Sequence, residues 1–156
     1  MTTELRFLEP DDWETWRDFR LRSLADSPDA YGSTYEREVV YDETAWRAWV
    51  ERANPVIAFD GGTPVACGGV IVNDAGEALV IAMWVVPEHR GRGLSKLILD
   101  AVVSWGRARD LPLVIGHNRA NPVARAAYLS YGFVPTGKSE PLREGSTAVC
   151  DELHLP

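Results

Sequence analysis

Residues 85–99, VVPEHRGRGLSKLIL, join a predicted strand to a predicted helix through a glycine-rich turn. The apolar run over residues 78–86 predicts a buried strand, and Pro87 ends it because proline has no N–H to donate to a sheet. After the turn, apolar residues recur at helical spacing on one expected face: Leu94, Leu97, Ile98, Ala101, Val102 and Trp105. Strand, turn and helix in this order form the unit around which we expect the fold to be built.

The turn consists of six residues that suit an anion: Arg90, Gly91, Arg92, Gly93, Leu94 and Ser95. The first N–H groups of a helix have no partner within it, and the positive end of the helix dipole lies there. Glycines let the backbone approach an anion, and two arginines add charge and forked donors. A phosphate or pyrophosphate is the expected ligand, although two glycines also suit a plain tight turn. Lys96 replaces the third glycine of a dinucleotide-binding turn, and the GxxxxGK[ST] loop is absent.

The rest of the chain predicts one domain, residues 1–156, with a mixed, mostly antiparallel sheet and an α/β (α+β) arrangement. Strands are expected over residues 3–8, 55–59, 63–72, 77–86, 111–117, 133–135 and 147–155. Helices are expected over residues 10–26, 42–50, 94–109 and 121–132, with a short helical turn near residues 33–36. The strands over 77–86 and 111–117 flank a helix, which predicts that they are parallel.

Local signals refine these elements. Asp11 with Glu14, Ser33 with Glu36, and Asp42 are the expected helix caps, and Asn121 before proline is another. Consecutive glycines at 68 and 69 predict that their strand is weakened or bulged there. Residues 139–146 are expected to form a polar loop. The apolar stripe that contains Trp46 and Trp49 is assigned to the core rather than to a ligand site.

Composition narrows the class of protein. The chain of 156 residues carries a net charge of −7, which argues against a nucleic-acid binder and weakly favours a cationic substrate. No apolar run approaches the ~20 residues that a membrane helix needs, and no signal peptide begins the chain, so we expect a cytoplasmic protein. Cys67 and Cys150 are expected to be buried free thiols. The three histidines have no metal-ligand spacing, so we expect no metal.

Two motifs carry a resemblance to a known family. Residues 90–95 resemble the Q/R-x-x-G-x-G/A signature of the GNAT superfamily of acyl-CoA N-acyltransferases, with Ser95 in place of the last glycine or alanine. Residues 121–133, NPVARAAYLSYGF, resemble the second GNAT motif, N-x-x-A-x-x-x-Y-x-x-x-G-F. The resemblance covers nearly the whole chain. It implies a GNAT-like domain in which two central parallel strands splay apart between flanking helices.

The resemblance also implies an activity, the transfer of an acetyl group from acetyl-CoA to a primary amine of a small molecule or protein in a ternary complex. The residues implied in binding the coenzyme are Val85, Val86, Arg90, Gly91, Arg92, Gly93, Leu94, Ser95 and Asn121. Val85 and Val86 would pair with the pantetheine arm through their backbones, and Asn121 would bond its amides. A backbone N–H near Met83 or Trp84 would stabilise the charge that develops on the thioester oxygen.

Proton transfer needs further groups. Tyr128 stands at the family's general-acid position, and a phenol of pKa about 10 can protonate a thiolate of pKa about 8.5. Glu77 is the only carboxylate on the predicted central strand and is the candidate base, although a solvated hairpin residue would look the same. Glu36, Glu38 and His117 are further options for the base. The two cysteines match no nucleophile motif.

Other functions remain open on the sequence. The main alternative is a non-catalytic acyl-CoA-binding sensor or regulatory module, and an arginine-glycine nucleic-acid binder is disfavoured by the acidic charge. The acceptor would be selected by residues 31–38, the hairpin after Phe59 and the loop over 139–146. Assembly as a homodimer is a further option.

Overall fold

The computed structural model describes residues 2–156. Its strands are β1 (Thr3–Phe7), β2 (Val56–Asp60), β3 (Thr63–Val72), β4 (Ala78–Val85), β5 (Leu113–Asn118), β6 (Val134–Pro141) and β7 (Val149–Leu155). Its α-helices are α1 (Trp13–Asp26), α2 (Tyr35–Glu38), α3 (Glu43–Ala53), α4 (Leu94–Arg107) and α5 (Pro122–Tyr131). Short 3-10 turns, Pro10–Asp12 and Pro87–His89, precede α1 and the turn before α4.

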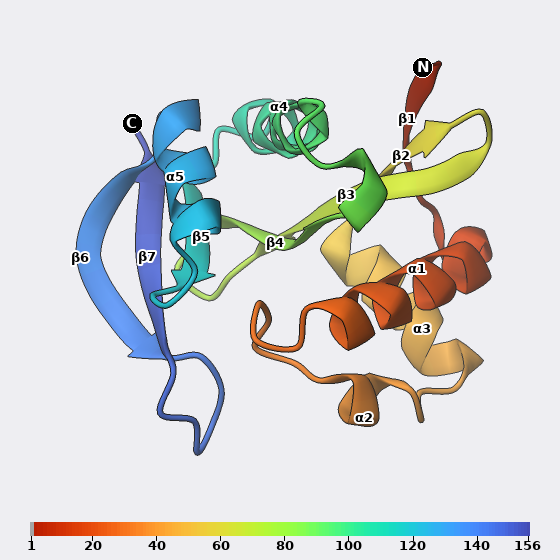
Figure 1. Cartoon of the computed structure of the whole chain (residues 1–156), viewed down its shortest axis with the longest axis horizontal. Helices are drawn as coiled ribbons and strands as arrows, with labels where there is room; N and C mark the ends of the chain where they lie inside the picture. Colours follow the sequence, from red (N-terminus) through yellow and green to blue (C-terminus); the bar gives the residue numbers. More distant parts are fainter. Residues whose placement is uncertain (1) are drawn as a thin grey trace.

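The strands form one sheet in the order β1-β2-β3-β4-β5-β7-β6, with helices on both faces (Figure 1). Two adjacent glycines of β3 show which helix covers each face, because a Cβ on Gly68 would meet Ile98 of α4 and one on Gly69 would meet Ala53 of α3. Only β4 and β5 are parallel, and every other pair is antiparallel. The predicted mixed, mostly antiparallel sheet is confirmed.

β4 has two halves with different neighbours. Its paired half, residues 78–80, lies between β3 and residues 113–115 of β5. The register with β3 then shifts, so that Ala82 and Met83 stand opposite Gly68 alone, and Ala82 takes a left-handed backbone with φ 59°. The open half, residues 82–85, keeps β3 on one side and has no ladder with β5 on the other. This bulge produces the splay that the resemblance implied.

Several local expectations hold. Asp42 accepts from the Ala45 N–H at 2.9 Å, and Asn121 accepts from the Ala124 N–H at 3.1 Å, so both cap their helices. The pairing of β3 with β4 is irregular at Gly68, but the extra residue belongs to β4 and not to the strand that contains the glycines. Trp46 is fully buried in the core, and Cys67 and Cys150 are free, the first buried and the second half-buried.

Other local expectations were wrong. The cap before α1 is not Asp11 with Glu14, because the Glu9 N–H donates to the Asp12 carboxylate at 2.9 Å, two residues earlier in the chain. Thr34, and not Ser33, caps α2 by accepting from the Arg37 N–H. In both places neighbouring residues have equivalent capping side chains, and tertiary packing decides which one is used.

The buried face of α4 is also rotated from the predicted one. Leu97 is 38% exposed, whereas the buried residues of the helix are Leu94, Ile98, Leu99, Val102, Val103 and Gly106. The helix packs mainly over β3, β4 and β2, which draws Leu99 and Val103 into the core in place of Leu97 and Ala101. The expected loop at 139–146 is shorter, because β6 pairs with β7 as far as Pro141 after a register shift between Pro135 and Ser139.

None of the helices within residues 2–156 is both long enough and apolar enough to cross a membrane.

Candidate active site

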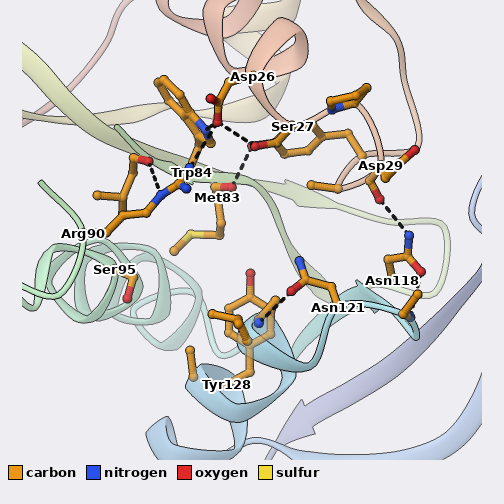
Figure 2. A pocket seen from close by; sticks show the side chains of 18 of the residues that line it. Asp26, Ser27, Asp29, Met83, Trp84, Arg90, Ser95, Asn118, Asn121 and Tyr128 are labelled. Carbon is orange, nitrogen blue, oxygen red and sulfur yellow. Dashed lines mark hydrogen bonds and ion pairs between the residues drawn. The ribbon is translucent and has the colours of Figure 1, made fainter. Parts of the chain in front are cut away.

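A cavity of about 1200 Å³ opens where β4 and β5 part (Figure 2). Four parts of the chain line it: residues 26–31 at and after the end of α1, the open half of β4 with the turn into α4, the segment from the end of β5 into α5, and residues 147–149 before and at the start of β7. These parts are far apart in sequence and meet only because β4 loses its partner at Ala82. The cavity therefore lies where β4 and β5 separate.

The glycine turn forms one end of the cavity. Gly91 and Gly93 have φ values of 79° and 77°, a left-handed backbone that glycine adopts without strain, and a Cβ on either would meet no atom within 4 Å. Gly93 immediately precedes α4, so the free N–H groups of the first helical turn begin at the cavity wall. Of the predicted turn residues, Arg92 is exposed and lies outside the lining, and the other five line the cavity.

Arg90 is engaged by protein groups. Its Nε donates to the Val85 carbonyl at 3.1 Å and its Nη2 to the Asp26 carboxylate at 3.1 Å. Asp26 also accepts from the Ser27 hydroxyl at 2.8 Å and from the Trp84 indole N–H at 3.0 Å. The hydrogen bonds from Ser27, Trp84 and Arg90 hold the pKa of Asp26 below its usual range, so this carboxylate is ionised at neutral pH.

The open half of β4 presents backbone polar groups to the cavity. The Val85 carbonyl accepts from Arg90, and the Met83 carbonyl accepts from the Tyr31 hydroxyl at 2.9 Å. Val86 differs from these two, because its N–H donates to the Val65 carbonyl of β3 at 2.9 Å and its side chain is buried outside the lining. Of the two valines predicted to pair with a ligand, only Val85 faces the cavity.

Tyr128 and Asn121 form the opposite wall, on α5 and at its start. The hydroxyl of Tyr128 points toward β4 (Figure 2) and has no hydrogen-bond partner among residues 2–156. Burial raises the pKa of Tyr128 to about 12, so the hydroxyl keeps its proton at neutral pH. The Asn121 carbonyl oxygen is used in capping α5, which leaves its amide nitrogen for a ligand.

Comparison with known proteins now adds to this geometry. Residues 12–133 match the model of the acetyltransferase (GNAT) family. The chain belongs to the GNAT acetyltransferase family. Comparison with curated protein sequences gives no match.

Solved structures show the same fold at low sequence identity. A GNAT family acetyltransferase from Streptococcus pneumoniae gives a TM-score of 0.80 at 15% identity, over 98% of each chain. The yncA protein of Salmonella typhimurium, solved with its cofactor acetyl-CoA, gives 0.78 at 16% identity over 99% of this chain and 94% of that one. The ribosomal-protein-S18-alanine N-acetyltransferase of Escherichia coli gives a TM-score of 0.70 at 18% identity, over 99% of this chain and 94% of that one.

Glu77, the expected base of this GNAT domain, does not reach the cavity. It precedes β4 at the far end of the strand, where it bonds to Asn73 through both its N–H and its carboxylate and borders a separate cavity of about 390 Å³. The expectation assumed unbroken alternation along the strand. The bulge reverses that alternation, so the Met83 side chain lies on the α4 face and that of Ile81 on the α3 face. Glu77 is therefore removed as a candidate.

The other options for a base also lie elsewhere. Glu38 is buried in an ion pair with Arg20, Glu36 is exposed on α2, and His117 is buried outside the cavity lining. The carboxylates in the lining are instead Asp26 and Asp29, which no motif indicated. Asp26 is the last residue of α1, and Asp29 lies in the segment after it, whose helix-breaking Ser-Pro-Asp signalled only a loop. Within residues 2–156 no group of three or more His, Cys, Asp or Glu side chains is arranged to hold a metal ion.

Proposed function

We propose that the protein transfers an acetyl group from acetyl-CoA to a primary amine by direct attack in a ternary complex. One observation carries this proposal: a single cavity joins the glycine turn before α4, the open half of β4 and the unpartnered hydroxyl of Tyr128. These are an anion site, a strand edge with free polar groups and a proton donor, which are the parts that a phosphorylated thioester substrate needs. Membership of the GNAT acetyltransferase family supports the same reaction.

The end of the cavity at the glycine turn holds the coenzyme through the helix dipole and through backbone N–H groups. The N–H groups at the start of α4, with Gly91, Gly93 and Ser95 in the turn, suit its pyrophosphate. The amide-bearing pantetheine arm would use the backbone of Val85 and the amide nitrogen of Asn121. Arg90 now covers the Val85 carbonyl, so it must release that oxygen when the arm takes its place.

The reaction requires charge stabilisation and proton transfer. The amine nitrogen attacks the thioester carbon, and the oxygen gains negative charge before the carbon–sulfur bond breaks. In extended backbone the N–H and C=O of one residue point to the same edge, so the N–H of Met83 shares the cavity side with its carbonyl and is the donor to that oxygen. A protonated amine must first lose a proton to solvent before its nitrogen can attack. After the attack the nitrogen loses a second proton to solvent, Tyr128 gives its proton to the departing sulfur, and the tyrosinate takes a proton back from solvent.

The acceptor would enter beside residues 26–31 and 147–149. Asp29 lines this part of the cavity, is exposed and forms no ion pair among residues 2–156, which favours a cationic amine. The acceptor in the name of the Escherichia coli enzyme is a ribosomal protein alanine, so both small-molecule and protein amines belong in the test.

Two measurements, made one after the other, test the proposal. Calorimetric titration with acetyl-CoA should show saturable binding, and a thiol-release assay should show release that depends on an amine such as spermidine or a peptide with N-terminal alanine. Binding together with acceptor-dependent release supports the proposal. Binding without release from any amine in a broad panel would overturn the catalytic proposal in favour of an acyl-CoA-binding regulatory module. No binding would overturn both.

A further inference from the structure

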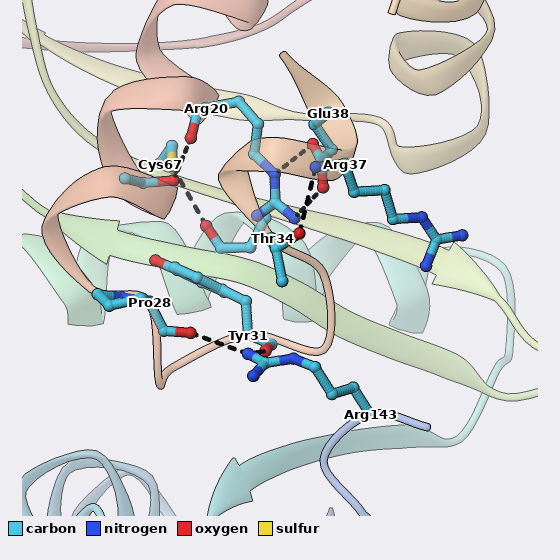
Figure 3. A network of polar contacts seen from close by, with 10 residues as sticks. Arg20, Pro28, Tyr31, Thr34, Arg37, Glu38, Cys67 and Arg143 are labelled. Carbon is cyan, nitrogen blue, oxygen red and sulfur yellow. Dashed lines mark hydrogen bonds and ion pairs between the residues drawn. The ribbon is translucent and has the colours of Figure 1, made fainter. Parts of the chain in front are cut away.

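Tyr31 lies between two arginines, Arg20 and Arg143 (Figure 3), and it lines the reaction cavity. It is only 8% exposed, and its hydroxyl donates to the carbonyl of Met83 at 2.9 Å. Met83 is one of the two bulge residues of β4 that stand opposite Gly68. The segment after α1 therefore reaches the open half of β4 and holds it at Met83, the residue whose N–H is the donor in the proposed function.

Arg20 of α1 holds the ring of Tyr31 from one side. Its guanidinium carbon lies 5.0 Å from the centroid of the Tyr31 ring and 5.1 Å from that of Trp49. The same guanidinium donates to both oxygens of Glu38, at 3.0 and 2.9 Å, with side-chain exposures of 6% for Arg20 and 2% for Glu38. Removing two charges from water is unfavourable, so such a pair is weak evidence for stability and better evidence for a fixed geometry.

Arg143, between β6 and β7, holds the backbone of the same segment from the other side. Its Nη2 donates to the Tyr31 carbonyl at 2.7 Å and to the Pro28 carbonyl at 2.9 Å. A Cβ on Gly32 would lie 3.0 Å from the Leu142 carbonyl, so the two loops are in close contact there. Both the ring and the backbone of Tyr31 are thus fixed by parts of the fold that are distant in sequence.

We propose that Tyr31 is a positioning residue that fixes the backbone of Met83 from its carbonyl side, and thereby the direction of the Met83 N–H that stabilises the thioester oxygen. The peptide that carries this N–H is held at its other end, where the Ala82 carbonyl accepts from the Cys67 thiol at 3.2 Å. This inference rests on the proposed function. It assigns Tyr31 no contact with the substrate, because its hydroxyl is already used on the Met83 carbonyl. Arg20, Glu38 and Arg143 act one step further away by fixing Tyr31.

The bulge needs such support for two reasons. Ala82 holds a left-handed backbone that alanine rarely adopts, so the Ala82–Met83 peptide that carries the donor N–H can relax unless the backbone of Met83 beyond it is fixed. A Met83 carbonyl free to turn toward the thioester would also place its negative end near the developing negative charge. Burial raises the pKa of Tyr31 above its usual range, so the hydroxyl is a permanent donor at neutral pH.

The test is Tyr31→Phe, examined by infrared spectroscopy of acetyl-CoA labelled with carbon-13 at the thioester carbonyl. In the native protein the carbonyl band of bound acetyl-CoA should lie at lower frequency than the band of acetyl-CoA in water, because the hydrogen bond from the protein polarises the carbonyl more strongly. In Tyr31→Phe the band should return toward its position in water, the dissociation constant should change less than about twofold, and kcat should fall about tenfold. Arg143→Met should move the band in the same direction by less. Tyr41→Phe is the matched control, because Tyr41 packs against Trp46 and lies outside the cavity lining, and it should leave all three values unchanged.

The outcomes separate this inference from the proposed function. If acetyl-CoA does not bind the native protein, the proposed function fails. If acetyl-CoA binds Tyr31→Phe with the native carbonyl band, the inference fails, even where turnover is slower. A parallel loss of affinity and thermal stability with no separate fall in kcat would also overturn it, because Tyr31 would then only support the fold.

Discussion

The two halves of β4 have similar sequences and different surroundings. Residues 78–80 lie between β3 and β5, and residues 82–85 have β3 on one side and a cavity on the other. Both halves are apolar, and side-chain burial alternates along the whole strand. The difference is in the backbone, because only the open half leaves strand-edge groups such as the Met83 and Val85 carbonyls to bond with side chains.

A single bulge at Ala82 and Met83 therefore divides one strand into a structural part and a chemical part. Backbone groups in the paired half are consumed by the sheet, and those in the open half are available for a ligand. Substitutions at matched positions toward the two ends should affect different properties. Changes near the paired half should act on stability, and changes near the open half should act on binding or turnover.

Gly93→Glu should have the largest effect. The new carboxylate would stand at the anion turn, and a like charge beside a pyrophosphate costs several kcal/mol, so acetyl-CoA affinity should fall by roughly 1000-fold or more in calorimetric titration. Gly76→Glu is the matched control, because Gly76 has φ 76°, has no atom within 4 Å of a Cβ, and lies in the turn that precedes the paired half. Equal loss of affinity in the two folded variants would show that the anion turn has no special role.

Tyr128→Phe should have the next largest effect. Removal of a general acid lowers turnover by about 100-fold or more, so thiol release should slow by that factor while acetyl-CoA affinity stays within about twofold. Tyr131→Phe is the control on the same helix, because its hydroxyl donates to Asp100 of α4 at 2.7 Å and lies outside the cavity lining. It should lower the free energy of unfolding by about 1 kcal/mol and leave kcat unchanged. Native turnover in Tyr128→Phe would limit Tyr128 to packing against Phe133.

Local chemistry made part of this site predictable. Gly91 and Gly93 occupy left-handed positions, and Asn121 caps a helix that begins with proline, each for reasons that act within a few residues. Tyr128 lies seven residues after Asn121, on the short helix that Asn121 caps, so a single sequence motif identified both residues. The parallel pair followed from the order of strand, helix and strand.

Long-range contacts made the rest unpredictable. The hydrogen bond from Tyr31 to Met83 spans 52 residues, and that from Arg143 to Tyr31 spans 112. Glu77 was misplaced because the alternation of side chains was carried through Ala82, which carries no local sign of a left-handed conformation. Glycines in β3 did indicate a bulge, but the extra residue belongs to the opposite strand, and only the pairing of the two strands shows this.

The smallest expected effect concerns two alanines of β4. Ala82→Gly removes a side chain that is only 8% exposed, a loss of about 0.8 kcal/mol per buried methyl group, and glycine adds about 0.5–1 kcal/mol of unfolded-state entropy. Glycine also relieves the left-handed conformation at φ 59°, which costs alanine about 1–2 kcal/mol. These contributions nearly cancel, so urea unfolding should give a free energy within about 0.5 kcal/mol of the native value.

Ala78→Gly, in the paired half, makes the same chemical change without the relief of strain. Ala78 is fully buried and is not among the residues with positive φ, so its loss should lower the free energy of unfolding by about 1.5 kcal/mol. The difference between the two variants measures the strain that the bulge holds at Ala82. If both lose the same stability, the left-handed conformation of Ala82 holds no strain, and the bulge needs no support against relaxation.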